Sequence, residues 1–233
     1  MNSRDSFARG DAAAVIFDFD GVIADTERLH LGAFREIFET RGWTLTDADY
    51  FDRYLGCDDH GLVVSYASDF SIALTADEIQ DLVERKTRAF ARHLSSPAVL
   101  FPGAAEAIRE IASRYPIAIA SGALHHEIDV ILRGAGIVDL FRLIVGADDV
   151  STHKPSPEPY LAAAAGLDVP PALCVAIEDS QAGLQAARAA GMRTIGLTTT
   201  SAAHVLVGAD RIVASLADVS AALVAEVAAV PGR

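Results

Sequence analysis

A strand-like apolar run ends in two carboxylates and a glycine in the stretch Val15-Ile16-Phe17-Asp18-Phe19-Asp20-Gly21-Val22-Ile23. The run begins near Ala12 and is typical of a strand that is buried on both faces, as in a parallel sheet. Open α/β sheets place their ligands at the carboxyl ends of such strands. Two acids in that place are costly unless a cation pairs with them. The stretch therefore predicts that Asp18 and Asp20 meet a positively charged group.

Two patterns divide the rest of the chain. Residues 25–95 read as helical without a convincing strand, and Thr75–Glu78 resembles a capping box. Beyond them, short apolar runs alternate with helical segments, which is the pattern of a doubly wound parallel sheet. The predicted strands are 12–18, 117–121, 143–145, 173–177, 193–197 and 211–213, and the predicted helices of this part are 104–114, 124–134, 157–166, 180–190, 202–207 and 216–227. We expect an α/β core, residues 1–24 and 96–233, with a small all-α domain, residues 25–95, inserted after the first strand.

The composition limits the classes of function. The chain has 233 residues, of which 51% are hydrophobic, and no apolar run is long enough to span a membrane. Residues 1–11 lack the apolar segment of a secretory signal, and Cys57 and Cys174 do not indicate a disulfide framework. We therefore expect a cytoplasmic protein. The net charge of −13 argues against nucleic acid or an anionic membrane as a partner, but it is compatible with a small anionic substrate if a metal reverses the local charge.

Reactive side chains follow four of the predicted strands. They are Asp18 and Asp20, Ser121 with Gly122, Lys154 in the loop after the third strand, and Glu178 with Asp179. Carboxylates are suited to hold Mg²⁺, and one carboxylate can attack phosphorus while a neighbouring carboxyl group donates a proton to the leaving oxygen. A lysine, a hydroxyl and backbone N–H groups can hold phosphoryl oxygens. This set of residues points to phosphoryl transfer.

The same residues resemble the four motifs of the haloacid dehalogenase (HAD) superfamily. The stretch Asp18–Glu27 resembles the first motif, Ser121 the second, Lys154-Pro155 the third and Ile177–Met192 the fourth. The order and the spacing match over nearly the whole chain. The helical insertion resembles the small cap of the branch that contains phosphoglycolate phosphatase and β-phosphoglucomutase. The resemblance implies a Rossmann-like HAD core with a helical cap.

The resemblance also implies a role for each residue of the first motif. Asp18 is expected to be the nucleophile and a metal ligand. Asp20 is expected to be the general acid and base, and its backbone carbonyl is expected to reach the metal. Because dehalogenases of this superfamily lack an acid at the position of Asp20, its presence favours phosphate chemistry.

The other three motifs are expected to hold the phosphoryl group and the metal. Ser121, Gly122 and Lys154 are expected to bind the phosphoryl group. Asp179 is expected to bind Mg²⁺ directly, and Glu178 to be a direct or an outer-shell partner. The implied cofactor is Mg²⁺.

The substrate is expected to be read by the cap. In sugar-phosphate mutases of this branch a histidine follows the first motif, and His30 occupies the corresponding place. A basic residue late in the last cap helix is also expected, for which Arg92 or Lys86 could serve. Those mutases carry an arginine in a cap loop where this chain has Asp58 and Asp59. The two acids disfavour a second phosphate on the substrate.

These expectations favour a phosphatase acting on a small phosphomonoester, such as a sugar phosphate, through an aspartyl-phosphate. A β-phosphoglucomutase-like mutase is the alternative, and a non-catalytic HAD-fold binding protein is the alternative of a different class. The expected partner is a small phosphorylated metabolite, with neither nucleic acid nor membrane. A monomer would leave room for a mobile cap.

Overall fold

The computed structural model describes residues 12–54, 57, 59–94 and 99–229. The chain divides into two compact units. Met1–Asp25 and Pro97–Arg233 form the first, which we call the α/β unit, and Thr26–Ser96 form the second, which we call the helical unit.

A six-stranded, wholly parallel sheet forms the centre of the α/β unit, and its strand order is β3-β2-β1-β4-β5-β6. The strands are β1 (Ala14–Phe17), β2 (Ile117–Ala120), β3 (Phe141–Val145), β4 (Cys174–Glu178), β5 (Arg193–Leu197) and β6 (Arg211–Val213). Strand β1 lies between β2 and β4, with Val15 paired to both Ile117 and Val175. Every residue of β1 is buried, as its continuous apolar sequence predicts. The predicted α/β fold with a parallel sheet is confirmed.

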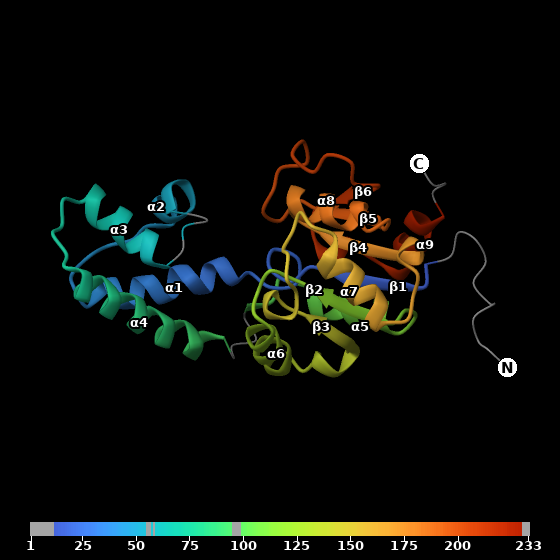
Figure 1. Ribbon diagram of the computed structural model, residues 1–233, viewed down its shortest axis with the longest axis horizontal. Helices are drawn as coiled ribbons and strands as arrows, with labels where there is room; N and C mark the ends of the chain where they lie inside the picture. Colours follow the sequence, from blue (N-terminus) through green and yellow to red (C-terminus); the bar gives the residue numbers. More distant parts are fainter. Residues whose placement is uncertain (1–11, 55–56, 58, 95–98, 230–233) are drawn as a thin grey trace. The chain divides into compact units, whose positions relative to one another are not determined.

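Helices flank this sheet (Figure 1). They are α5 (Ala104–Ala112), α6 (His125–Gly134), α7 (Glu158–Gly166), α8 (Gln181–Ala189) and α9 (Ala221–Ala228). Helices α7 and α8 pack on the sheet face that carries Ala14, Ile16 and Ala176. Their contact residues are mostly alanines, which allow the helix backbones to approach the strands closely. Because α7 and α8 follow β3 and β4, their packing fixes the loops that leave those strands.

Two predicted helices of the α/β unit are wrong. Residues 202–207 form turns, because a six-residue segment makes too few helical hydrogen bonds to offset the cost of nucleation. The expected last helix, 216–227, is split into a short 3₁₀ turn, Leu216–Asp218, and α9. The side chain of Ser220 accepts a hydrogen bond from Leu223 N and begins a new helix at that point.

The helical unit has a core of its own. It consists of α1 (Thr26–Glu39), α2 (Asp47–Asp49), a π-helical turn (Tyr50–Tyr54), α3 (Asp59–Asp69) and α4 (Ala76–His93). The predicted capping box is confirmed, since Thr75 N donates to Glu78 Oε2 at 2.9 Å and Glu78 N donates to Thr75 Oγ1 at 3.3 Å. The core is aromatic, with the rings of Phe38 and Tyr66 4.5 Å apart.

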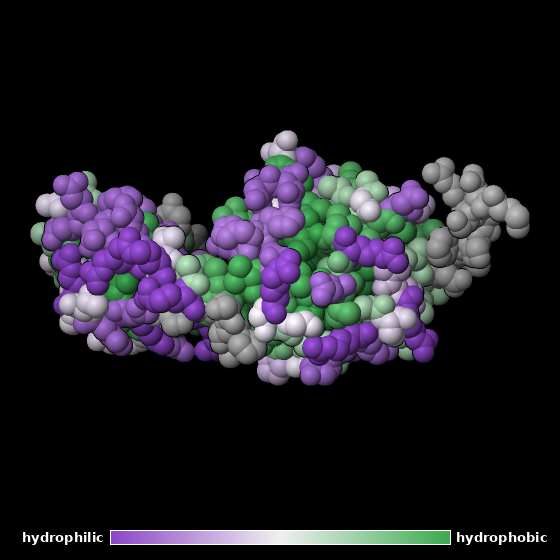
Figure 2. Space-filling view, turned by 90° about the horizontal axis from the view of Figure 1, so that it is seen from below, coloured by the Kyte–Doolittle hydropathy of each residue, from purple (hydrophilic) through white to green (hydrophobic). Residues whose placement is uncertain are grey.

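The surfaces of the two units differ in character. On the face drawn in Figure 2, the helical unit presents mostly hydrophilic residues, whereas hydrophobic residues lie between hydrophilic ones on the α/β unit. Ion pairs such as Arg35–Asp47, at 2.6 Å, contribute to the polar surface of the helical unit. None of the helices within the described residues combines the length and the apolar character that crossing a membrane requires.

The chain leaves the α/β unit and returns to it at adjacent points. Ala24 and Leu100 form an antiparallel bridge, and Asp25 N donates to Val99 O at 2.8 Å. The insertion therefore departs only a few residues after the end of β1.

Candidate active site

The carboxyl ends of three neighbouring strands carry the predicted reactive groups. Asp18 directly follows β1, Ser121 follows β2, and Glu178 ends β4, with Asp179 next to it. Because β1 lies between β2 and β4, these side chains share one edge of the sheet. Asp18, Ser121, Glu178 and Asp179 are all buried.

Lys154 connects the first and the fourth motif. Its Nζ atom lies 2.8 Å from Asp18 Oδ1 and 2.6 Å from Glu178 Oε1. It also lies 5.2 Å from the ring centre of Tyr160, on α7. The lysine comes from the loop after β3, and only 12% of its side chain is exposed. The structure therefore brings the lysine of the third motif onto both carboxylates.

Glu178 is fully buried and accepts several hydrogen bonds. Its Oε1 atom accepts from Lys154 and from Tyr160 Oη, the latter at 2.7 Å. Its Oε2 atom accepts from Asp179 N at 3.1 Å, Ser180 N at 3.2 Å and Ser180 Oγ at 2.9 Å. A Cβ atom on Gly183 would lie 1.7 Å from Glu178 Oε1. A glycine is therefore required at 183 so that α8 can pass over this carboxylate.

Asp179 is fixed by two segments from other strand ends. Its Oδ2 atom accepts a hydrogen bond from Thr200 Oγ1. A Cβ atom on Gly21 would lie 2.0 Å from the same Oδ2, and Gly21 has a φ of +76°. Only glycine fits both the space and the backbone conformation at 21. The turn after Asp20 therefore lies directly on Asp179.

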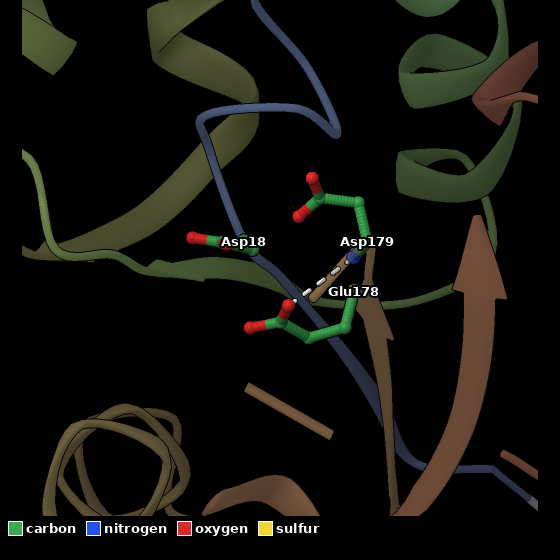
Figure 3. A group of neighbouring side chains, drawn as sticks. All are labelled: Asp18, Glu178 and Asp179. Atoms are coloured by element: carbon green, nitrogen blue, oxygen red, sulfur yellow. Dashed lines mark hydrogen bonds between the residues drawn. The ribbon is translucent and has the colours of Figure 1, made fainter. Parts of the chain in front are cut away.

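The carboxylates outnumber their cation. Asp18, Glu178 and Asp179 each offer an oxygen within 4.8 Å of the others, and they converge from the ends of β1 and β4 (Figure 3). Lys154 supplies one positive charge to this group. Three buried carboxylates and one ammonium leave an excess of negative charge that a divalent cation would neutralise. Buried oxygen ligands of this kind suit Mg²⁺.

The pKa values reflect this imbalance. Burial and the neighbouring Glu178 raise the pKa of Asp18 well above its usual value. Burial raises the pKa of Asp179 to about 6, against the opposing hydrogen bond from Thr200. Burial alone would lower the pKa of Lys154, but Asp18 and Glu178 raise it above its usual value. The lysine therefore stays charged, while the carboxylates lack positive charge.

Asp20 lies in a tight turn that begins two residues after β1. Phe19 O accepts from Ile23 N at 2.8 Å and from Ala24 N at 3.1 Å, and Gly21 N donates to Ala24 O at 2.9 Å. Asp20 is only partly buried. The turn therefore places Asp20 at the same strand end that carries Asp18.

Ser121 and Gly122 lie in a short loop between β2 and α6. Ser121 N donates to Val145 O at 2.9 Å, and its Oγ accepts from Ala123 N at 3.0 Å. Because the oxygen accepts in this bond, the hydroxyl hydrogen can donate to an anion. Gly122 is exposed.

The model of the haloacid dehalogenase-like hydrolase family matches residues 15–197 of the chain. The chain belongs to this family. The match spans all four of the motifs that the sequence analysis identified, and the expected family is confirmed.

Several known proteins are similar to this HAD-like chain in sequence or structure. Protein CbbY of Rhodobacter capsulatus is 37% identical over 191 residues, which cover 78% of this chain and 83% of that protein. A beta-phosphoglucomutase of Bacillus subtilis is 34% identical, and the match covers 91% of this chain and 94% of that protein. A phosphorylated carbohydrates phosphatase of Thermotoga maritima is also 34% identical, and the match covers 78% of this chain and 83% of that protein. Among solved structures, a HAD family hydrolase of Deinococcus radiodurans with bound phosphate and sodium has a TM-score of 0.78 at 30% identity. The match covers 96% of this chain and 100% of that chain.

His30 and Arg92 lie in the helical unit of this HAD-like hydrolase. His30 Nδ1 lies 2.7 Å from Lys86 Nζ, which also binds Asp59 Oδ1 at 2.6 Å. Burial and, secondarily, Lys86 lower the pKa of His30 to about 4. Arg92 is exposed and pairs with Glu36. Their expected roles in substrate binding stay predictions, and Asp58 lies outside the described residues.

Several residues that shape this site were missed in the sequence. Tyr160, Thr199 and Thr200 carry hydroxyl groups that bond to Glu178, Gly21 and Asp179. The position of the threonines in the sequence could have indicated them, since residues 198–200 directly follow β5 and strand ends of a parallel sheet share an edge. The position of Tyr160 could not, because a tyrosine inside a helix is more often a core residue.

Proposed function

We propose that this HAD-like hydrolase is a Mg²⁺-dependent phosphatase that hydrolyses a small phosphomonoester through an aspartyl-phosphate at Asp18. The buried group of Asp18, Lys154, Glu178 and Asp179 is the observation that carries the proposal. A nucleophile in contact with an ammonium, beside an excess of buried carboxylates, is suited to bind a cation and a phosphate together.

The proposed reaction has two steps. Asp18 attacks phosphorus, and the bond to the leaving oxygen breaks while Asp20 donates a proton to that oxygen. Asp20 then takes a proton from water, and the water oxygen attacks phosphorus and releases Asp18 and inorganic phosphate. The proposed donors to the phosphoryl oxygens are Lys154, the Ser121 hydroxyl and the backbone N–H of Gly122.

Mg²⁺ would be held by Asp18 and Asp179, and it supplies positive charge that favours phosphoryl transfer. Glu178 is assigned to the outer shell, because donors already occupy both of its oxygens. It would then act by holding Lys154 and by accepting from the backbone next to Asp179.

The helical unit supports a phosphatase over a mutase. Lys86, which could have met a second phosphate, is paired with Asp59, so its charge is already balanced. We therefore propose a leaving group without a second phosphate, such as a neutral sugar or polyol. The phosphorylated carbohydrates phosphatase of Thermotoga maritima has a name consistent with such a substrate.

Hydrolysis of p-nitrophenyl phosphate with Mg²⁺ and with EDTA tests the activity, followed by a panel of phosphorylated metabolites. We expect release of phosphate that requires Mg²⁺ and is lost in Asp18→Asn. No turnover with Mg²⁺, or turnover unaffected by Asp18→Asn, would contradict the proposal and favour a non-catalytic binding protein.

A second assay separates the phosphatase from a mutase, for which the beta-phosphoglucomutase of Bacillus subtilis is the precedent. The enzyme is given β-glucose 1-phosphate together with a bisphosphate primer. We expect free phosphate as the product. Accumulation of glucose 6-phosphate without free phosphate would replace the phosphatase by a mutase.

A further inference from the structure

The segment Thr198–Thr200 follows β5 and bonds to two other strand ends. We call it the β5 strap. Thr199 Oγ1 donates to Gly21 O in the turn after β1, and Thr200 Oγ1 donates to Asp179 Oδ2 after β4. Thr198 N donates to Val213 O of β6 at 3.0 Å. Because β4 lies between β1 and β5 in the sheet, the strap has to pass the end of β4 to reach Gly21.

The strap contacts the site at close range. A Cβ atom on Gly21 would lie 3.0 Å from Thr200 Cγ2 and 2.0 Å from Asp179 Oδ2. Gly21, Asp179 and Thr200 therefore form one packed contact.

The chemistry of the two threonines suits orientation rather than reaction. Thr200 is exposed, so its hydroxyl is not needed to satisfy a buried core. A hydroxyl that donates to one oxygen of the Asp179 carboxylate restrains that group and leaves the other oxygen available to a cation. Outer partners of this type orient metal ligands.

We propose that the β5 strap positions the site, on the basis of the function proposed above. Thr200 orients Asp179 as a ligand of the divalent cation, and Thr199 fixes the Gly21 turn that carries Asp20. Neither threonine contacts the reacting atoms, so both are positioning residues. The strap thereby makes the end of β5 a part of the catalytic site.

The test compares Thr200→Val, Thr200→Ser, Thr199→Val and the control Thr198→Val. Valine keeps the shape of threonine and removes the hydroxyl. Thr198 suits the control because, within the described part of the chain, its hydroxyl makes only one long hydrogen bond, of 3.5 Å to Val213 O. The melting temperature of each full-length protein is followed against Mg²⁺ at constant ionic strength, without substrate. Turnover of p-nitrophenyl phosphate is measured separately.

We expect Thr200→Val to raise the Mg²⁺ concentration at half-maximal stabilisation by about 10-fold, with Thr200→Ser and Thr198→Val close to the wild type. Thr199→Val is expected to lower kcat by about 10-fold with little change in Mg²⁺ affinity, because a displaced turn misplaces Asp20. Equal Mg²⁺ affinity in Thr200→Val and the wild type, or equal losses in Thr198→Val and Thr200→Val, would overturn the proposal. The Mg²⁺ titration uses no substrate, so it tests Thr200 even if no phosphomonoester is hydrolysed.

Discussion

Each unit of this protein buries a lysine among carboxylates and aromatic rings, but the balance of charge differs. In the α/β unit, Lys154 contacts Asp18 and Glu178, with Asp179 nearby. In the helical unit, and among the residues that the structure describes, Lys86 contacts one carboxylate, Asp59, and a histidine whose lowered pKa keeps it neutral at pH 7. The first group has an excess of negative charge, whereas the second is balanced. The comparison indicates that the first group is suited to bind a further cation, whereas the charges of Lys86 and Asp59 in the second group offset each other.

The small number of lysines and their burial agree with a specific role for each. Lys86 and Lys154 are the two lysines of the sequence, and its other basic side chains apart from histidine are arginines. Both lysines are largely buried, with 3% and 12% of their side chains exposed. An ammonium is compact and can donate to several partners around one point, which a planar guanidinium cannot do in the same space. Replacing either lysine by arginine would therefore be disruptive.

The largest expected effect separates activity from stability in the α/β unit. Asp18→Asn should lower turnover of p-nitrophenyl phosphate by about 10⁴-fold or more, as expected when a nucleophile is lost. It should not lower the unfolding free energy of the metal-free protein. Lys154 keeps its ion pair with Glu178, and the substitution removes one of the carboxylates that are in excess over the lysine. Urea unfolding in EDTA measures this. Asp139→Asn makes the same change at an exposed position, and it should alter neither quantity. Loss of stability in Asp18→Asn beyond that control would contradict the charge imbalance.

A second experiment compares the two lysines directly. Lys154→Met should cost about 3–5 kcal/mol of unfolding free energy, because Asp18 and Glu178 stay buried without a cation. Lys86→Met should cost about 1 kcal/mol, since Asp59 is 31% exposed and can be hydrated while methionine packs against the rings.

The single tryptophan of the chain allows the units to be followed separately. Trp43 lies in the helical unit, so its fluorescence reports on Lys86→Met, while circular dichroism reports on both units. An equal or larger loss in Lys86→Met would show that the helical cluster is not the balanced one.

The lowered pKa of His30 predicts a pH effect in the helical unit. The unfolded histidine has a pKa of 6.5 and the folded one of about 4, so the unfolded state binds more protons between these values. Stability should therefore be fully present above pH 6.5 and fall as the pH drops toward 4. Between pH 7 and pH 5 the expected loss is about 2 kcal/mol. In His30→Gln, which can still accept from Lys86, this part of the loss should vanish, as judged by Trp43 fluorescence in urea; an unchanged pH dependence would contradict it.

The last comparison concerns two tyrosine hydroxyls, one in each unit. Tyr160→Phe keeps the ring beside Lys154 and removes only the donor to Glu178, which should cost about 1.5 kcal/mol. Tyr54→Phe removes a comparable donor, 2.8 Å from Asp69 Oδ2, in the helical unit. Asp69 is partly hydrated and is paired with Arg53, so we expect a loss below 1 kcal/mol. Urea titrations measure the unfolding free energy of each variant. A larger loss in Tyr54→Phe than in Tyr160→Phe would contradict the comparison.

Local sequence predicted most of the fold because its signals act over short distances. The buried run at β1 and the capping box at Thr75 each specify their own element. The helix predicted over residues 202–207 is wrong because this short apolar run contains no local signal that distinguishes a helix from turns. The packing of Leu206, which is 1% exposed, depends on distant parts of the chain.

The sequence by itself determined which acids, hydroxyl and lysine reach one edge of the sheet, because parallel strands end on the same side. Only the tertiary structure decided how they are partnered. The contacts of Tyr160 with Glu178, Thr200 with Asp179 and Asp59 with Lys86 join residues that are 18, 21 and 27 positions apart. No periodicity encodes such contacts, because they depend on how helices and loops pack after the strands have paired. The positions of the carboxylates after β1 and β4 could therefore be predicted from the sequence, but the hydroxyl groups that hydrogen-bond to them could not.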